Sequence, residues 1–278
     1  MERGQERYQR QSILPQIGPE RQAMLANAKV LLIGCGALGC HLADQLARGG
    51  VGWIRLADRD VVEFSNLQRQ TLFEESDAAE ARAKADAAGR RIRAINSSVF
   101  VEPVVTDVWA GNIDELVDVG KGVVDLILDG TDNVQTRYLL NDIAVKRKIP
   151  WVHGACVGTE GRVMPIVPGA ACLRCVYPTP PPARELPTCD TAGVLQSAAA
   201  MVASLQIVQA IKILTGQFTL ADQKLWSLDV WSGKFSSISL ESERQPDCPC
   251  CGLNEFPFLS TSSADATASL CGRNAVQI

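Results

Sequence analysis

The stretch that decides the fold is KVLLIGCGALG, residues 29–39. Residues 30–33 are apolar and branched, which predicts a short buried strand. This run continues directly into a G-x-G-x-x-G pattern formed by Gly34, Gly36 and Gly39, and residues 40–48 have a helical pattern. Glycines let the backbone turn tightly and approach a phosphate, and the N–H groups at a helix start attract the anion. The stretch therefore predicts a nucleotide-binding turn.

A carboxylate closes the next predicted strand. Residues 53–58 form a second apolar run that ends at Asp58. In dinucleotide-binding folds an acidic residue about 20 residues after the glycines holds a ribose. The pattern indicates a nucleotide, but it does not choose between NAD, FAD and ATP.

Strand and helix patterns alternate through residue 155. We expect further strands at 99–105, 123–129 and 150–155, and helices at 80–95, 112–119 and 134–148. This alternation predicts an α/β fold, a Rossmann-like and mostly parallel sheet with helices on both faces. Residues 160–167 and 225–240 look like antiparallel strands that extend the sheet, and residues 191–215 look like one long helix.

Composition excludes several classes of protein. The 278 residues carry a formal net charge of −4, which argues against a dedicated nucleic-acid binder. We find no charge-free apolar stretch of about 18 residues, so we expect no membrane span. The polar N-terminus does not resemble a signal peptide, so the ten cysteines indicate a reducing, cytoplasmic setting.

Four of these cysteines form two C-x-x-C pairs, Cys172 with Cys175 and Cys248 with Cys251. Two such pairs can provide a tetrahedral zinc site with four cysteine ligands, and their wide separation suggests a structural metal that joins remote segments. Two unrelated pairs are the alternative, and Cys250 is a rival ligand. A thioredoxin-like redox centre is less favoured because residues 172–175 look like part of a strand.

Other candidate residues are ambiguous when taken alone. Cys189 ends a proline-rich loop and precedes the predicted long helix, where a thiol pKa falls, so a nucleophile and an incidental cysteine are equally favoured. Arg7 and Arg10 lie three residues apart on one predicted helical face, which favours a solvated surface, with contact to an anion as the alternative. We expect His41 and His153 to be packed or capping residues.

The chain resembles the ThiF/MoeB/HesA group, relatives of the ubiquitin-activating enzymes. The matching motifs follow the family's order from Arg7 to Gly252. They are Arg7-Tyr8-x-Arg10-Gln11, the glycine turn, Asp58-x-Asp60, Asn66-Leu67-Gln68-Arg69-Gln70, Lys84 ahead of Ile95-Asn96, Thr131-Asp132-Asn133, both C-x-x-C pairs, Thr188-Cys189 and Ala192-Gly193-Val194.

This resemblance implies an adenylyltransferase that uses ATP and Mg²⁺. The carboxylate of a small ubiquitin-like sulfur-carrier protein ending in Gly-Gly would attack the α-phosphate, giving an acyl-adenylate and pyrophosphate. The resemblance implies that Asp58 binds the ribose, that Asn66 orients the phosphates, and that Arg69 and Lys84 bind the triphosphate. It implies that Asp132 binds Mg²⁺. It also implies a homodimer in which Arg10 reaches the phosphates bound by the neighbouring subunit.

The resemblance also implies a later sulfur-transfer step. Cys189 aligns with the family's crossover-loop cysteine, which can form a persulfide link to the carrier. No rhodanese-like domain follows, so we expect the sulfur donor to be a separate protein.

The sequence departs from the family at two points. The segment before Lys84 differs, so Arg82 is an alternative phosphate ligand. Gly130 replaces a common Cys or Ser and should be tolerated. Asp60 is a weaker site candidate because an acidic loop residue is usually solvated.

We expect one adenylation domain over residues 1–253. It comprises a helical segment 1–28, a nucleotide-binding core 29–156 and an antiparallel, crossover-loop and zinc part 157–253, followed by a poorly ordered tail 254–278. Two alternative functions are an NAD-dependent oxidoreductase and a non-catalytic zinc-stapled scaffold that binds a ubiquitin-like protein.

Overall fold

One eight-stranded sheet runs through the chain in the computed structural model, which describes residues 6–181 and 189–260. The spatial order is β3-β2-β1-β4-β5-β6-β7-β8. The strands are β1 (Lys29–Ile33), β2 (Trp53–Asp58), β3 (Phe100–Val105), β4 (Leu126–Asp129), β5 (Trp151–Val157), β6 (Glu160–Ile166), β7 (Lys224–Asp229) and β8 (Lys234–Ser239). Neighbours from β3 to β5 pair parallel, and those from β5 to β8 pair antiparallel. The predicted fold class is confirmed.

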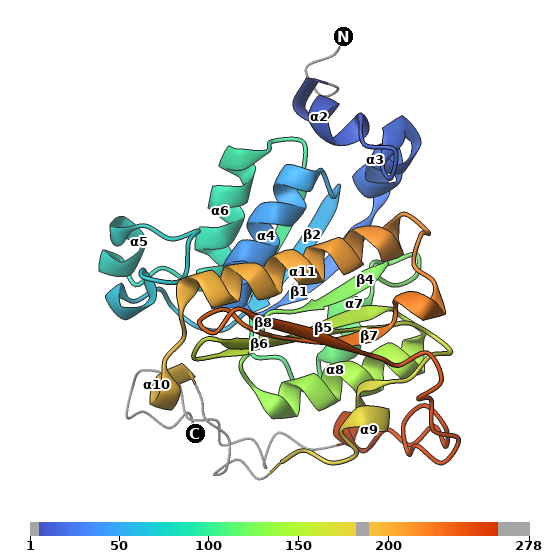
Figure 1. Cartoon of the computed structure of the whole chain (residues 1–278). Helices are drawn as coiled ribbons and strands as arrows, with labels where there is room; N and C mark the ends of the chain where they lie inside the picture. Colours follow the sequence, from blue (N-terminus) through green and yellow to red (C-terminus); the bar gives the residue numbers. More distant parts are fainter. Residues whose placement is uncertain (1–5, 182–188, 261–278) are drawn as a thin grey trace.

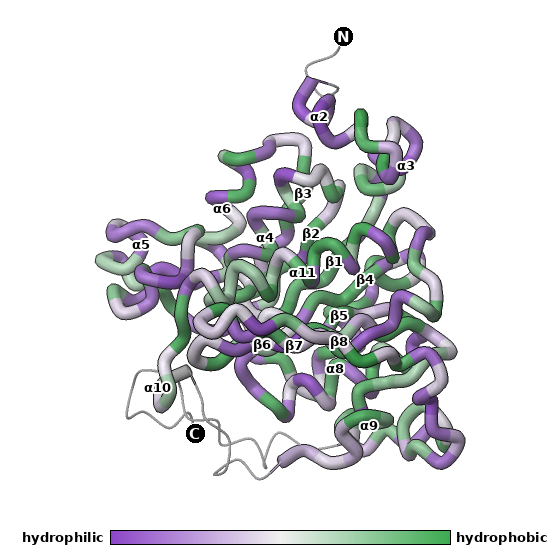
Figure 2. The backbone as a smooth tube through the Cα atoms, viewed as in Figure 1, coloured by the Kyte–Doolittle hydropathy of each residue, from purple (hydrophilic) through white to green (hydrophobic). Residues whose placement is uncertain are grey.

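Alternation along the strands divides the core between the two faces of the sheet. Val30 and Leu32 pack under α4 (Ala37–Gly49), α6 (Lys84–Ile95) and α11 (Gln196–Leu214). Leu31 and Ile33 point to the other face, toward α7 (Ile113–Val117) and α8 (Val134–Arg147). In Figure 2, where the backbone is coloured by the hydropathy of each residue, hydrophobic residues are concentrated in these central strands. Both faces of the parallel half are therefore buried, as such sheets require.

Two short helices precede β1 in the chain. They are α2 (Gln9–Ser12) and α3 (Gly18–Asn27), drawn together at the top of Figure 1. Gln11 donates to the carbonyl oxygen of Gly49 at 3.0 Å, and Asn96 donates to the Tyr8 hydroxyl at 2.7 Å. Gly49 is the last residue of α4, so the N-terminal segment is held at the end of that helix remote from the glycine turn.

The prediction of a helix at residues 80–95 is wrong for the first turn of that helix. A short helix, α5 (Glu75–Ala79), comes first, and α6 begins only at Lys84. Ala81 has a φ of +47°, and Ala83 forms an isolated bridge with Val61. Pairing with the loop after β2 therefore overrides the helical preference of this alanine-rich segment.

The helix expected at residues 191–215 is also interrupted. A four-residue helix, α10 (Cys189–Ala192), is separated from α11 by Gly193, which has a φ of +71°. Val194 then bridges Gly158, and Leu195 donates to the Gly158 carbonyl oxygen. Cys189 therefore begins a short separate helix and does not cap the long one.

The packed part of the chain continues beyond residue 253. A 3₁₀ turn, η3 (Pro257–Leu259), lies against α8, where the Phe258 N–H donates to Asp142 at 3.1 Å. Ordered structure at residues 254–260 departs from the expected poorly ordered tail, and residues 261–278 lie outside the described residues. The strand expected around residues 172–175 is wrong as well, because Cys172 precedes a short helix, α9 (Leu173–Val176).

Within the described residues, α11 alone is long and apolar enough to cross a membrane, with a mean hydropathy of 1.5. The sequence led us to expect no such segment. The small side chains of Ala199, Ala203 and Ala210 are fully buried, and the helix packs on α4, β5 and β6. Its apolar composition is therefore that of a helix in the protein core.

Candidate functional site

The glycine turn lies at the carboxyl end of β1 and opens α4. Gly34 has a φ of +88°, and a Cβ there would lie 2.7 Å from the Gly130 carbonyl oxygen. A Cβ on Gly39 would overlap the Gly34 carbonyl. Gly36 is different, because a Cβ there would meet no atom within 4 Å. Two glycines thus permit close backbone packing, and the third leaves open space at the helix start, where a phosphate can approach.

Gly130 belongs to the same close packing. A Cβ at this position would lie 2.7 Å from the Gly34 carbonyl oxygen and 3.0 Å from the Gly39 Cα. The end of β4 therefore lies directly against the glycine turn. Glycine is well suited to this position, where the sequence departs from the family pattern.

Asp58 joins the glycine turn to the loop after β2 through its two carboxylate oxygens. One accepts the Cys35 N–H at 2.6 Å, and the other accepts the Asp60 N–H at 2.8 Å. Burial raises the pKa of Asp58, while the charge of Lys84 and these two backbone bonds act in the opposite direction. The carboxylate lies beside the turn as predicted, and ribose binding stays a prediction.

Lys84 and Asp60 form an ion pair next to this carboxylate. The Lys84 Nζ lies 3.0 Å from Asp60 Oδ2, and the lysine is only 7% exposed. Burial acts to lower the pKa of Lys84, but the charges of Asp58 and Asp60 outweigh it and the net shift is upward. Lys84 is therefore a cation at neutral pH. The view of Asp60 as a merely solvated loop residue is wrong.

Arg82, the alternative to Lys84, has different partners. Its Nε lies 3.1 Å from Asp77, and it also pairs with Glu80. These acidic residues belong to α5 and the turn that follows it. The structure therefore brings Lys84, and not Arg82, to the carboxylates beside the glycine turn.

Asp132 follows β4 and is exposed. Its charge is one of the causes that raise the pKa of Lys84. The next residue, Asn133, caps α8 by accepting the N–H groups of Gln135 and Thr136 at 2.8 and 3.2 Å. The loop at the end of β4, which packs against the glycine turn at Gly130, thus carries an exposed carboxylate. Magnesium binding by Asp132 stays a prediction.

A buried ionic cluster under this loop was not predicted. Asp129, the last residue of β4, is fully buried and contacts the Nδ1 atom of His153 at 2.8 Å. Its carboxylate also accepts from Thr131 and lies 3.4 Å from the Nε atom of Arg137. Arg137 in turn donates to the Thr131 carbonyl oxygen at 2.7 Å. The cluster fixes the residue before Asp132, and its signal in the sequence was an acidic residue ending a strand.

Neighbouring charges and burial together set the protonation states of Asp129 and His153. The pKa of Asp129 is lowered because Arg137 and His153 outweigh the effect of burial. The pKa of His153 is lowered because burial outweighs the attraction of Asp129. His153 is therefore a packed neutral residue, as expected, that donates from Nδ1 to an ionised carboxylate.

Asn66 and Arg69 follow the Asp58 loop, in and after a 3₁₀ turn, η1 (Phe64–Asn66). The buried Asn66 side chain accepts the Glu63 N–H at 3.1 Å, and Arg69 donates to the Ser65 carbonyl oxygen at 2.9 Å. Both side chains hold this loop together. Their predicted contacts with phosphates remain predictions.

Arg10 is not brought to the glycine turn of its own chain. It is exposed on α2, which contacts the carboxyl end of α4, whereas the glycine turn opens the amino end. A helix of 13 residues is about 20 Å long. A contribution of Arg10 to a nucleotide site would therefore have to come from a second chain.

The two C-x-x-C pairs meet in space. The sulfur atoms of Cys172, Cys175, Cys248 and Cys251 all lie within 4.8 Å of one another. Four sulfurs around a zinc ion at about 2.3 Å would lie about 3.8 Å apart. Two cross-pair distances, Cys172 to Cys248 at 3.6 Å and Cys175 to Cys251 at 3.4 Å, are close to that spacing. The donor set and its geometry therefore fit a tetrahedral metal site with four thiolate ligands.

Four other described cysteines are buried and do not belong to this set of four sulfurs. Cys35, Cys40 and Cys156 are buried, and burial raises the pKa of Cys40 to about 12, so this thiol is unreactive. Cys250 is also buried, and its sulfur accepts from Asn141 at 3.2 Å. The side chain of Cys189 lies outside the described residues.

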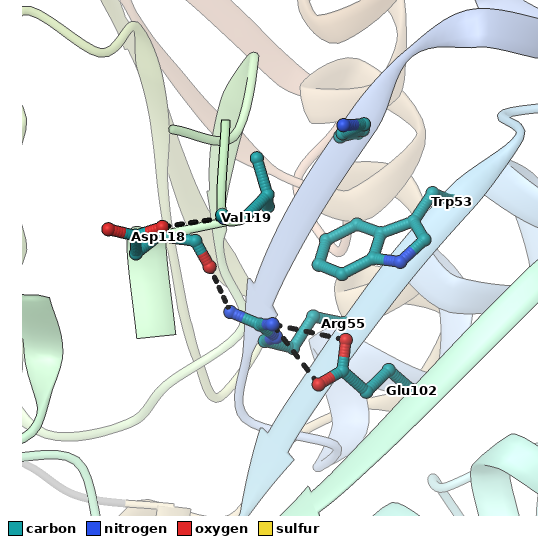
Figure 3. Close-up of a pocket in the computed structure, with 7 residues that line it drawn as sticks. Trp53, Arg55, Glu102, Asp118 and Val119 are labelled. Carbon is teal, nitrogen blue, oxygen red and sulfur yellow. Dashed lines mark hydrogen bonds and ion pairs between the residues drawn. The ribbon is translucent and has the colours of Figure 1, made fainter. Parts of the chain in front are cut away.

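A surface pocket of about 300 Å³ lies toward the amino ends of β1 and β2 (Figure 3). Its main polar group, Arg55, donates to both carboxylate oxygens of Glu102 and to the carbonyl oxygens that end α7, and it stacks on Trp53. These contacts join β2, β3 and α7. We assign this cluster a structural role, since the glycine turn lies at the other end of β1.

Comparisons with known proteins agree with this architecture. The chain is 45% identical over 273 residues to the sulfur carrier protein ThiS adenylyltransferase of Bacillus subtilis, covering 98% of this chain and 79% of the relative. It is 38% identical over 253 residues to the sulfur carrier protein adenylyltransferase of Thermus thermophilus, covering 89% and 90%. The fold is similar to that of Escherichia coli MccB, with a TM-score of 0.75 at 23% identity over 88% of this chain and 74% of the MccB chain. The ThiF family model matches residues 8–250, and the chain belongs to the ThiF family.

Proposed function

We propose that this chain adenylylates the C-terminal carboxylate of a small ubiquitin-like sulfur-carrier protein that ends in Gly-Gly. The observation that carries this proposal is the buried Lys84 ion pair beside the glycine turn, with Asp132 following β4, the strand whose end packs against that turn. Ligands of open α/β sheets bind at that edge. The two sulfur-carrier adenylyltransferases named above, at 45% and 38% identity, support this substrate class.

The reaction joins two anions. A carboxylate oxygen of the carrier attacks the α-phosphorus of ATP, an acyl–phosphate bond forms, and the bond to the β-phosphate oxygen breaks with release of pyrophosphate. Fixed cations that offset the phosphate charge without reorganising lower the barrier to such a step. Lys84 suits this role because the carboxylates of Asp58 and Asp60 keep the buried ammonium group protonated, and its ion pair with Asp60 keeps it in place. We also assign the triphosphate to Arg69, the ribose to Asp58 and phosphate orientation to Asn66.

Asp132 is our candidate for holding Mg²⁺. A carboxylate is a preferred ligand of this ion, which when bound screens the phosphate oxygens. The residue is exposed at the carboxyl end of β4, and its loop is fixed by the buried Asp129 cluster. The support for this role is the position of the carboxylate just after β4, whose end packs against the glycine turn.

We further propose that the active form is a homodimer in which Arg10 serves the partner's nucleotide. The support is the position of this arginine at the far end of α4 from its own glycine turn. We assign zinc to the cysteine cluster as a structural ion that joins residues 172–175 to residues 248–251. The eight described cysteines without disulfides fit a reducing, cytoplasmic setting.

Cys189 is our candidate nucleophile for the later sulfur-transfer step, with sulfur delivered by a separate donor protein. Its place directly after residues 182–188, as the first residue of α10, is that of the crossover-loop cysteine in the family. We expect Cys189→Ala to keep carrier-dependent pyrophosphate exchange near the wild-type rate and to lose any carrier-linked persulfide by mass spectrometry. Loss of exchange would contradict this division of roles.

An NAD-dependent oxidoreductase is not favoured. It would not need Lys84 and Asp132 together, and one of the two histidines of the chain, His153, is buried and engaged with Asp129. A non-catalytic scaffold would have no need of a buried cation beside the glycine turn.

The test is carrier-dependent exchange of pyrophosphate into ATP. Full-length protein is mixed with ATP, Mg²⁺ and candidate carriers ending in Gly-Gly, and NAD binding is measured in parallel. We expect exchange with at least one carrier, dependent on its terminal glycine and lost in Asp132→Ala. Tight NAD binding without exchange for any carrier would overturn the proposal.

A further inference from the structure

Asn141 connects the two halves of the cysteine cluster. It lies in the middle of α8 and is fully buried. Its Oδ1 atom accepts the N–H of Leu173 at 2.9 Å, and its Nδ2 atom donates to the sulfur of Cys250 at 3.2 Å. Leu173 lies inside the first C-x-x-C pair and Cys250 inside the second. One side chain therefore contacts both halves of a site whose halves are 76 residues apart.

The same face of α8 holds the surrounding segments. Tyr138 donates to the Tyr177 carbonyl oxygen at 2.9 Å, just after the first cysteine pair. Asp142 accepts the Phe258 N–H at 3.1 Å, beyond the second pair. Residues 138, 141 and 142 share one helical face because they are three and four positions apart. Asn141 contacts both halves through the residues between the paired cysteines, and the neighbouring Asp142 carboxylate lies 3.9 Å from Arg174 in the first half.

Cys250 is a neighbour of the cluster and not one of its four sulfurs. The N–H group of Asn141 points to its sulfur, and the thiol hydrogen-bonds to the Asp142 carboxylate. Both contacts hold Cys250 toward α8. The flanking Cys248 and Cys251 are thereby left to face Cys172 and Cys175.

We propose that Asn141 is a positioning residue of the cysteine cluster, which aligns both C-x-x-C pairs before and during metal binding. This inference rests on the proposal that the cluster binds zinc. Groups that orient metal ligands through hydrogen bonds typically change metal affinity about 10- to 100-fold when removed. Loss of this side chain removes the hydrogen bonds to the Leu173 N–H and to the Cys250 sulfur together and leaves the Asp142 contact of Cys250 in place, so the two halves lose the amide that joins them.

The test measures zinc release from the full-length protein into a chromophoric chelator, with zinc content determined by mass spectrometry. We expect Asn141→Ala to release zinc about 10- to 100-fold faster than wild type. The matched control is Asn96→Ala. Asn96 is equally buried and donates two hydrogen bonds, to Tyr8 and to the Ala47 carbonyl oxygen, but it lies on the other face of the sheet. We expect Asn96→Ala to release zinc at the wild-type rate.

The outcomes separate the inference from the zinc proposal. Absence of zinc in the wild type, with no uptake of added zinc or cobalt, would overturn both. Zinc in the wild type with equal release from Asn141→Ala and Asn96→Ala would overturn the inference alone. Cys250→Ala keeps the test usable if Asn141→Ala does not fold. We expect it to retain one zinc per chain, with a cobalt–thiolate band of wild-type intensity and moderately faster release. Loss of the metal in this variant would make Cys250 a ligand and contradict the assignment.

Discussion

Lys84 and Asp60 are joined twice, through backbone and side chain. The Lys84 N–H donates to the Asp60 carbonyl oxygen at 2.8 Å, and the Lys84 Nζ lies 3.0 Å from the Asp60 carboxylate. Asp60 also donates its own N–H to Asp58 at 2.8 Å. A single loop residue thus fixes the start of α6, the direction of its first side chain and the carboxylate that braces the glycine turn.

The first prediction concerns the charge of Lys84. We expect Lys84→Met to lower carrier-dependent pyrophosphate exchange by about 100- to 1,000-fold, the typical loss when one preorganised group that stabilises transition-state charge is removed. Arg82→Met is the matched control, because Arg82 is a cation two residues away that pairs with Asp77 and Glu80. A comparable loss of exchange in both variants, measured at saturating ATP, would contradict the assignment.

The second prediction concerns Asp60. Asp60→Asn keeps the backbone contact to Lys84 and removes the side-chain charge. We expect exchange to fall about 10-fold, because the ammonium group is no longer held toward the glycine turn. In a double-mutant cycle, adding Asp60→Asn to Lys84→Met should cost little further activity, because the two residues contact each other. Additive losses would show that Asp60 acts independently of Lys84.

The third prediction concerns Arg10 and a second chain. Arg10→Ala and Asp132→Ala should each abolish most exchange. If the arginine serves the partner's site, a mixed dimer carries one doubly damaged site and one intact site. After subunit exchange, an equal mixture should therefore recover about a quarter of the wild-type activity, since half of the dimers are mixed. No recovery, with mixed dimers verified by native mass spectrometry, would place Arg10 at its own site.

The fourth prediction concerns pH and His153. Its pKa is lowered in the folded chain, whereas an unfolded histidine titrates near 6.5. As the pH falls through about 6.5, the unfolded chain takes up a proton that the folded chain does not, so the free energy of unfolding decreases. His41, the other histidine, has a pKa shifted the same way by burial.

We expect urea unfolding of the wild type to show a lower midpoint at pH 5.5 than at pH 7.5. His153→Gln should lower stability overall, because it disturbs a buried pair with Asp129, yet reduce the difference between the two pH values. His41→Gln provides the comparison for the second histidine. An unchanged pH difference in His153→Gln would mean that this residue titrates alike in both states.

The strand–turn–helix unit and the parallel half of the sheet could be predicted because their signals are local. Residues 29–39 contain the strand, the glycines and the helix start in one continuous segment. The helix breaks at residues 81–83 and 193–195 could not, since they arise from pairing with Val61 and Gly158, which are remote in the sequence. Local propensity favours a continuous helix in both places until these contacts form.

The candidate site was predicted less evenly. The four cysteines that the structure brings together could be predicted from their spacing, because two residues between paired cysteines allow both sulfurs to bind one metal ion. The ion pair of Asp60 with Lys84 and the contact of Asp129 with His153 had no such signal. Each joins residues 24 positions apart whose proximity depends on how strands and helices stack. Asn141 was missed for the same reason, as an asparagine inside a helix has no motif of its own.

Helix α8 has Asp132 and the Asn133 cap at its start, and the Tyr138, Asn141 and Asp142 face lies within it. Each added residue turns an α-helix by about 100° and advances it by about 1.5 Å. The number of residues between the two features therefore fixes their relative phase. We expect this segment to tolerate substitutions at exposed positions such as Gln135 but no insertion or deletion. Its length should therefore fix the distance and the relative orientation of the Asp132 loop and the cysteine cluster.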